Sequence, residues 1–281
     1  MLELPEVEVL RKDLEKEVVG KRIKDALVMT PSVVTAFHRT RPDFSKLLEG
    51  RKITAVRRRG TVLFIDLDEP RTWIVDPGAT GSLHRATSTE KPGKDTHWIV
   101  TFTIGGAIHG TDPIRGGGGR MGVVPTPDTL ALAGLSPDAI DPLEDNPTWP
   151  DFLQVLKAAA GPLKSVLQDE TLILGVGEVY SDEVLWEAGL RYDRQSHTLT
   201  EQEVRRMYRA LQEVMHAAIK QRGSSLDEPG QEESIDEDGV SPGHIRVYGR
   251  DGRPCLRCRH TIVKTKLKKR SVTYYCEQCQ M

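Results

Sequence analysis

Apolar residues recur at helical spacing near the start of the chain. They lie three or four positions apart, on one face of a helix: Val7, Leu10, Leu14 and Val18. Pro5 suits the first turn of this helix, and Gly20 suits its end. The pattern therefore predicts an amphipathic helix at the start of the chain.

Short β-rich segments follow this helix. We expect strands within residues 22–29, 52–68, 72–75, 98–103 and 107–110. Gly105 and Gly106 stand between the last two segments and are typical of a tight hairpin turn. Strands separated by frequent turn residues favour a β-sandwich, which is flanked here by one helix.

The spacing of apolar residues becomes helical near residue 149. Residues 126–149 are rich in Pro and Asp and are expected to form a hinge. One or two helices are predicted within 152–167, and two more at 181–188 and 201–219. The acidic stretch 224–239 has no apolar face, so we expect a mobile loop there.

These patterns together predict an α+β multidomain fold. The expected parts are a β-sandwich domain with its flanking helix at 1–130, a helical domain at 131–223, an acidic mobile loop at 224–242 and a small basic module at 243–281. A chain of 281 residues is long enough for two domains and one small module.

The composition narrows the class of protein. Hydrophobic residues make up 38% and charged residues 28%, which is typical of a soluble globular protein. There is no apolar run of 18 residues, so no membrane span is expected. The acidic first eight residues do not resemble a secretory signal. We therefore expect a cytoplasmic protein, and a monomer.

Charge is distributed unevenly along the chain. The formal net charge is only −2, but the last 39 residues contain ten Lys or Arg against two acids, a net charge of +8. Just before them, residues 227–238 contain seven acids and no base. A basic segment of this kind favours a polyanionic partner.

The cysteines all lie in this basic segment. Cys255, Cys258, Cys276 and Cys279 form the pattern C-x2-C-x17-C-x2-C and are the only cysteines of the chain. Two close pairs of thiolates suit tetrahedral zinc, and metal binding would supply folding energy that so small a module lacks. The alternatives are two disulfides or four unrelated thiols. None of the eight histidines lies in an H-x-E or H-E-x-x-H pattern, so no histidine is assigned to a metal.

Basic residues fill the interval between the cysteine pairs. They are Lys264, Lys266, Lys268, Lys269 and Arg270. Their alternation with apolar residues predicts a β-hairpin whose cationic edge contacts backbone phosphates. The alternatives are a solvated charged face and a surface for protein contacts.

Three sequence blocks resemble, in the same order, those of the formamidopyrimidine-DNA glycosylase and endonuclease VIII family. They are M-L-E-L-P-E-V-E at 1–8, G-V-G-E-V-Y at 175–180, and V-Y-G-R at 247–250 followed by the four cysteines. Weaker matches are T-G-S-L at 80–83 and D-P at 112–113. The resemblance implies a β-sandwich domain, a hinge, a helix-two-turn-helix domain and a C-terminal β-hairpin zinc finger. It also implies damaged or abasic duplex DNA as the partner.

The family's chemistry, as the resemblance implies it, begins at the N-terminus. Removal of Met1 exposes a proline whose amine attacks C1′ of the damaged nucleotide and forms a Schiff base. Here Leu2 occupies the position of that proline, and a bulky residue there should block removal of Met1. Glu3 matches the glutamate that moves protons around the sugar. Glu6 is also retained, and an acid in the first helical turn suits capping.

Several other positions differ from the family pattern. The substituted positions are Thr61 for a phosphate-contacting lysine, Glu178 for an asparagine, and Ala79, Ile114 and Gly116 at the void-filling or neighbouring positions. Arg115 and the finger's Arg270 are retained. The lesion-processing residues are thus replaced while the finger is kept.

Further DNA contacts are expected in the second half of the chain. Gly175 and Gly177 predict a tight turn whose backbone N–H groups face a phosphate. Lys164 either contacts a phosphate or is solvated, and Lys266 and Arg270 are expected to bind phosphates from the finger.

The sequence leads to one hypothesis with two alternatives. The hypothesis is a DNA-binding member of the family whose lyase chemistry is impaired. The alternatives are a non-catalytic binder of damaged DNA and a monofunctional glycosylase in which Glu3 activates water without a Schiff base. If it is active, it is expected to be a DNA glycosylase or an abasic-site lyase.

Overall fold

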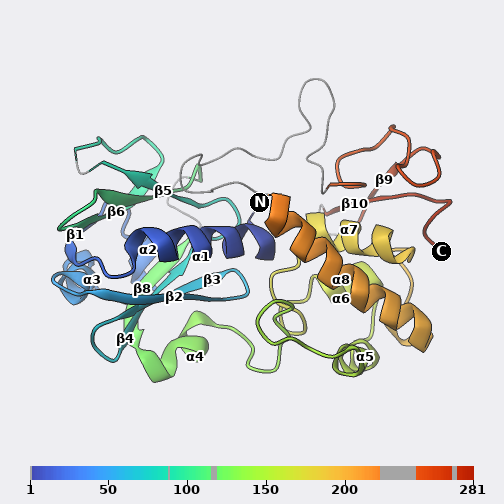
Figure 1. Cartoon of the computed structure of the whole chain (residues 1–281), viewed down its shortest axis with the longest axis horizontal. Helices are drawn as coiled ribbons and strands as arrows, with labels where there is room; N and C mark the ends of the chain where they lie inside the picture. Colours follow the sequence, from blue (N-terminus) through green and yellow to red (C-terminus); the bar gives the residue numbers. More distant parts are fainter. Residues whose placement is uncertain (1, 88, 115–118, 222–244, 268–270) are drawn as a thin grey trace. The chain divides into compact units, whose positions relative to one another are not determined.

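The chain forms two compact units, which meet in sequence at Pro137 and Asp138. A computed structural model describes residues 2–281 except 88, 115–118, 222–244 and 268–270 (Figure 1). The predicted mobile loop at 224–242 therefore lies outside the described residues. No helix among those that are described is long and apolar enough to cross a membrane.

Helix α1 (Leu4–Val18) opens the N-terminal unit, as the apolar spacing predicts. Pro5 lies in its first turn, and its buried face includes Leu4, Val7, Leu10 and Leu14. Arg58 of strand β2 is buried and forms an ion pair with Glu8 of the helix, with an Nε–Oε2 distance of 2.9 Å. Both apolar and ionic contacts therefore hold α1 to this unit.

Two four-stranded antiparallel sheets make up the β-sandwich. The first sheet has the order β1 (Ile23–Val28), β6 (Thr96–Phe102), β7 (Ala107–Thr111) and β5 (Ser82–Ala86). The second has the order β2 (Ile53–Arg59), β3 (Val62–Leu67), β4 (Arg71–Asp76) and β8 (Arg120–Pro125). The predicted β-sandwich with a flanking helix is confirmed.

The core of this unit lies between the sheets and α1. Trp73 of β4 and Trp98 of β6 meet edge to face, with ring centroids 5.7 Å apart. They belong to one cluster of buried residues that also includes apolar side chains of α1. Large aromatic side chains from both sheets therefore join the layers.

The structure adds elements that the sequence pattern did not predict. They are the helices α2 (Ser32–Thr35) and α3 (Arg41–Leu48) and the strands β5 and β8. The segment 52–68, expected to be β-rich throughout, divides into β2 and β3 at Gly60, whose φ of +56° forms the turn. A 3-10 turn (Thr126–Asp128) and helix α4 (Thr129–Ala133) occupy part of the predicted hinge.

Helix α4 moves the end of the N-terminal unit beyond the expected boundary at residue 130. Ala133 is buried in a cluster with Val62, Phe64, Ile74 and Val124 of the second sheet. Because this packing ties α4 to the sandwich, the unit extends to Pro137.

The second unit consists of helices and a small hairpin. Its helices are α5 (Trp149–Ala158), α6 (Leu163–Leu167), α7 (Glu178–Ala188) and α8 (Glu201–Gln221), with a 3-10 turn at Ser196–Thr198. The hairpin pairs β9 (Val263–Lys266) with β10 (Val272–Tyr275). Figure 1 shows α7 and α8 side by side, and the Arg206 side chain of α8 donates to the Ala188 carbonyl at the end of α7.

A buried ion pair joins the helices of this unit to the hairpin. The side chains of Lys164 and Asp182 are 1% and 0% exposed, and their Nζ and Oδ1 atoms are 2.6 Å apart. Asp182 also accepts hydrogen bonds from the Thr273 hydroxyl at 2.6 Å and from the Tyr274 N–H at 2.8 Å. The structure thus differs from both expectations for Lys164. Its ammonium is neither solvated nor open to a phosphate, because Asp182 takes it into the interior.

The next residue of α7 makes a second attachment. Buried Glu183 accepts hydrogen bonds from the backbone N–H groups of Arg246, Val247 and Tyr248 at 2.8–2.9 Å. Burial raises the pKa of Glu183 to about 7, although these three donors oppose the shift. Two consecutive acids of α7 therefore hold two separate segments of the finger.

We expect Asp182→Ala to destabilise the protein strongly. Truncation leaves the Lys164 ammonium buried without its counter-charge, at a cost of about 3–5 kcal/mol. The free energy of unfolding, measured by urea denaturation, checks this value. Asp193→Ala is the matched control, because Asp193 pairs with Arg191 at an exposed site and its loss should cost at most about 1 kcal/mol. Equal stability of the two variants would contradict the argument.

Candidate active site and metal centre

Leu2 lies at the position where the resemblance places the nucleophile. Its backbone N–H donates to the Ala79 carbonyl, with an N–O distance of 3.0 Å. Its side chain is partly buried and packs against the core of the N-terminal unit. The Leu2 nitrogen is therefore fixed by one hydrogen bond and by apolar packing.

Glu3 and Glu6 form a reciprocal cap at the start of α1. The Glu6 carboxylate accepts the Glu3 N–H at 2.7 Å, and the Glu3 carboxylate accepts the backbone N–H of Glu6. Both residues are buried, and Glu3 is only 2% exposed. The expected capping role of Glu6 is present, and Glu3 shares it.

Two loops that carry weak family matches meet near Leu2's partner. Thr80, next to Ala79, donates its hydroxyl to the Asp112 carboxylate at 2.8 Å, and the Ile114 N–H donates to the same oxygen at 2.9 Å. Asp112 is buried, so it serves as the common anchor of both loops. The sequence blocks at 1–8, 80–83 and 112–113 thus come together in one region of the N-terminal unit.

The positions of the missing family side chains follow from this arrangement. Ala79 is exposed and Ile114 is half exposed, so neither is part of the core. Thr61 follows Gly60 in the two-residue turn between β2 and β3. No cation occupies the Thr61 position, and the nearby Arg58 is tied to Glu8. Arg115 and Gly116 lie outside the described residues.

The G-V-G-E-V-Y block forms the turn before α7. Gly175 has a φ of +72°, which favours glycine, and Gly177 is the N-cap residue of the helix. Glu178 is the first helical residue, so a carboxylate stands in the first turn. The predicted tight turn is present. The phosphate contact of its N–H groups remains a proposal.

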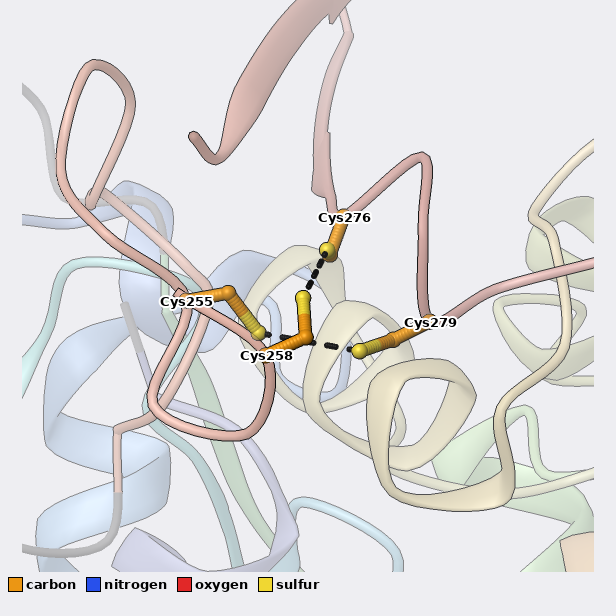
Figure 2. A group of neighbouring side chains, drawn as sticks. All are labelled: Cys255, Cys258, Cys276 and Cys279. Carbon is orange, nitrogen blue, oxygen red and sulfur yellow. Dashed lines mark hydrogen bonds between the residues drawn. The ribbon is translucent and has the colours of Figure 1, made fainter. Parts of the chain in front are cut away.

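The four cysteines converge in the finger, although they come from segments at the two ends of the hairpin (Figure 2). One sulfur atom from each lies within 4.8 Å of all the others. The Sγ–Sγ distances are 3.5 Å for Cys258 and Cys276 and 3.9 Å for Cys255 and Cys279, and all four thiols are free. This donor set can hold a single metal ion, and the expected alternative of two disulfides is not present.

Donors around Cys255 favour the thiolate that a metal requires. The Trp186 indole N–H and the Arg257 backbone N–H each lie 3.4 Å from its sulfur. Burial alone would raise the pKa of Cys255, but the backbone N–H groups of Cys258 and Arg257 and the Trp186 indole lower it to about 6. Trp186 was not predicted as part of this site, because nothing local in the sequence connects α7 to a cysteine 69 positions later.

The basic hairpin has the predicted alternation. Lys264 and Lys266 are exposed on β9, and the residues between and before them are partly buried. Lys264 also lies over the Tyr274 ring, 5.1 Å from its centroid. The exposed edge is therefore cationic at these two positions. Arg270 lies outside the described residues.

Comparison with known proteins agrees with this architecture. Residues 1–118 match the model of the formamidopyrimidine-DNA glycosylase N-terminal domain, and residues 139–229 match that of its H2TH domain. The chain is similar to formamidopyrimidine-DNA glycosylases of Desulfitobacterium hafniense (31% identity over 100% of both chains) and of Pelotomaculum thermopropionicum (33% identity over 100% of this chain and 99% of the relative).

A solved structure shows the same fold. The Lactococcus lactis Fpg in complex with DNA containing an abasic site superposes with a TM-score of 0.85, at 27% identity and over 99% of each chain. The fold class and the resemblance drawn from the motifs are both confirmed. With relatives at least 31% identical along their whole length and two domain models matched in order, the chain belongs to the formamidopyrimidine-DNA glycosylase family.

Proposed function

We propose that this protein binds damaged or abasic duplex DNA and that its Schiff-base lyase step is impaired. The observation that carries the proposal is the state of Leu2. With Met1 attached, the Leu2 nitrogen is a peptide nitrogen whose N–H donates to Ala79. Its lone pair is delocalised into the carbonyl of Met1, so it cannot attack C1′ and form an imine.

The surrounding residues support the same conclusion. The phosphate-contacting lysine of the family is replaced by Thr61, and the void-filling methionine by Ala79. Without these groups, the lesion is held less firmly for attack, since positioning supplies much of a catalytic effect. A primary amine at Met1 would stand one residue away from the position of the family nucleophile.

A monofunctional glycosylase is the second candidate function, and the retained Glu3 favours it. Its carboxylate is buried beside Leu2 and accepts the Glu6 N–H, which favours the ionised form. An ionised carboxylate can act as a general base toward water. Such an enzyme would release the base and leave an intact abasic strand.

DNA binding itself is proposed through the finger and the turn before α7. Lys264 and Lys266 present exposed ammonium groups along β9, and such groups contact phosphates without reading sequence. The backbone at Gly175 and Gly177 adds the positive end of α7. The similar Lactococcus lactis protein is named as a complex with abasic-site DNA.

We further propose that the metal of the finger is zinc. Four thiolates in tetrahedral reach are the commonest structural zinc site. Zinc would supply no reaction step here. It would fold the finger, so that Lys264 and Lys266 are presented on an ordered strand.

Restoring the family nucleophile tests the impaired lyase step. We expect borohydride to trap no covalent adduct between the wild-type protein and an abasic-site duplex, because no free amine stands at Leu2. In Leu2→Pro/Thr61→Lys, removal of Met1 exposes a proline amine, and an adduct that maps to the N-terminal peptide should form. Intact-mass measurement confirms which N-terminus each protein carries.

Controls make this result decisive. Thr61→Lys alone should give no adduct, since it leaves Leu2 in place. A wild-type adduct at the N-terminal peptide would overturn the proposed impairment. Base release from a lesion duplex, with cutting only after added alkali, would establish the monofunctional glycosylase instead.

Metal removal should disorder the finger and abolish DNA binding together. Structural zinc contributes about 10–16 kcal/mol of apparent binding free energy in isolated fingers, so Cys276→Ser or a strong chelator should unfold it. Zinc content by mass spectrometry and duplex binding by anisotropy measure both effects. Ser196→Ala is a control outside the finger, and its zinc content should stay unchanged. Full DNA binding by the zinc-free protein would contradict this role.

The salt dependence of binding tests the two lysines. If each neutralises one phosphate, Lys264→Gln/Lys266→Gln should reduce the slope of log K against log salt by about 2. The matched control is Lys16→Gln/Lys94→Gln, since these lysines are also strongly exposed and lie in the N-terminal unit. An equal change in both double variants would mean that β9 has no particular role.

A further inference from the structure

Two histidines stand opposite each other on the outer face of the first sheet. His84 of β5 pairs directly with His109 of β7, and their ring centroids are 5.2 Å apart. Their neighbours Leu83 and Ile108 belong to the core cluster. Since successive side chains of a strand point to opposite faces, the two imidazoles lie on the face turned away from the core.

Both imidazoles are short of hydrogen-bond partners. His109 is only 2% exposed and has no hydrogen bond with any residue that the structure describes. The Nδ1 atom of His84 is buried and also has no partner within the described part of the chain. Buried polar atoms are nearly always satisfied in proteins, so two unsatisfied rings side by side indicate a missing ligand.

A carboxylate completes the group. Glu90 comes from the connection between β5 and β6, and one ligand atom each of Glu90, His84 and His109 lies within 4.8 Å of the others. The Thr87 N–H donates to the Glu90 carboxylate at 3.3 Å and orients it. Ligand atoms about 2.0–2.2 Å from a zinc ion lie at most about 4.4 Å apart, so a small rotation of the exposed Glu90 side chain suffices.

We propose that His84, His109 and Glu90 form a second metal site, which binds a divalent transition-metal ion of the zinc class. Two imidazoles and one carboxylate are ligands that Zn²⁺ accepts, and three protein ligands leave a fourth position for water. Burial lowers the pKa of both histidines, and Glu90 offsets this only in part, so both rings are in the neutral form that ligates.

The consequence of this site is local to the N-terminal unit. A bound ion would link the edge strand β5, its neighbour β7 and the connection that follows β5. The three ligands come from different elements, which is why no H-x-E or H-E-x-x-H pattern marks them. The proposal does not depend on the fate of the lyase step, and it leaves the cysteine site unchanged.

Titration of the full-length protein with its finger already zinc-loaded tests the site. We expect isothermal titration with Zn²⁺ to show one more equivalent than the cysteines bind. Long-range ¹H–¹⁵N NMR should show the ring nitrogens of His84 and His109 shift on saturation. Glu90→Gln should weaken this second binding event at least about 10-fold, and His84→Gln/His109→Gln should abolish it. His216→Gln, at an exposed histidine of α8, should leave it unchanged.

Three results would overturn the proposal. They are the absence of a second equivalent, a second equivalent that survives in Glu90→Gln at full affinity, and a loss of equal size in His216→Gln. If the buried histidine variants fail to fold, Glu90→Gln still decides, because Glu90 is exposed and its replacement removes only the charge. The cysteine-bound zinc serves as the internal reference in every titration.

Discussion

Burial of helix α1 is the constraint on which the chemistry of the N-terminal unit depends. Leu4, Val7, Leu10 and Leu14 are fully or almost fully buried against the sandwich. A shift of one residue would rotate this face by about 100° and expose it. The N-terminal segment therefore cannot slide to bring the Met1 amine into the place of the Leu2 nitrogen. For this reason a single substitution at position 2 has consequences for the reaction.

The capping arrangement strengthens this constraint. Glu3 and Glu6 satisfy each other's backbone N–H groups at the start of α1, so both carboxylates already serve the helix. Their retention is consistent with a structural requirement, whether or not the chemistry persists. The replaced positions Thr61, Ala79 and Ile114 lie in turns and loops outside the core, where substitution does not disturb the fold.

In the second unit, α7 has the corresponding role. Asp182 binds the hairpin through Thr273 and Tyr274, Glu183 binds residues 246–248, and Trp186 donates to Cys255. One helix thus attaches the finger at three levels. A protein that no longer bound DNA would have no evident use for so elaborate an attachment, which supports DNA binding as the retained function.

Local patterns in the sequence determined much of this protein. The period of apolar residues predicted α1 and the long helices, turn residues located most strands, and the spacing of four cysteines predicted the metal centre, because each signal lies within a few residues along the chain. Only the tertiary structure decided the rest. Lys164 is a charged residue in sequence, yet its interior position depends on Asp182, which comes 18 residues later. The group of His84, Glu90 and His109 exists only because β5 and β7 pair across the sheet. Such contacts join distant segments, and no periodicity or motif of a single segment can encode them.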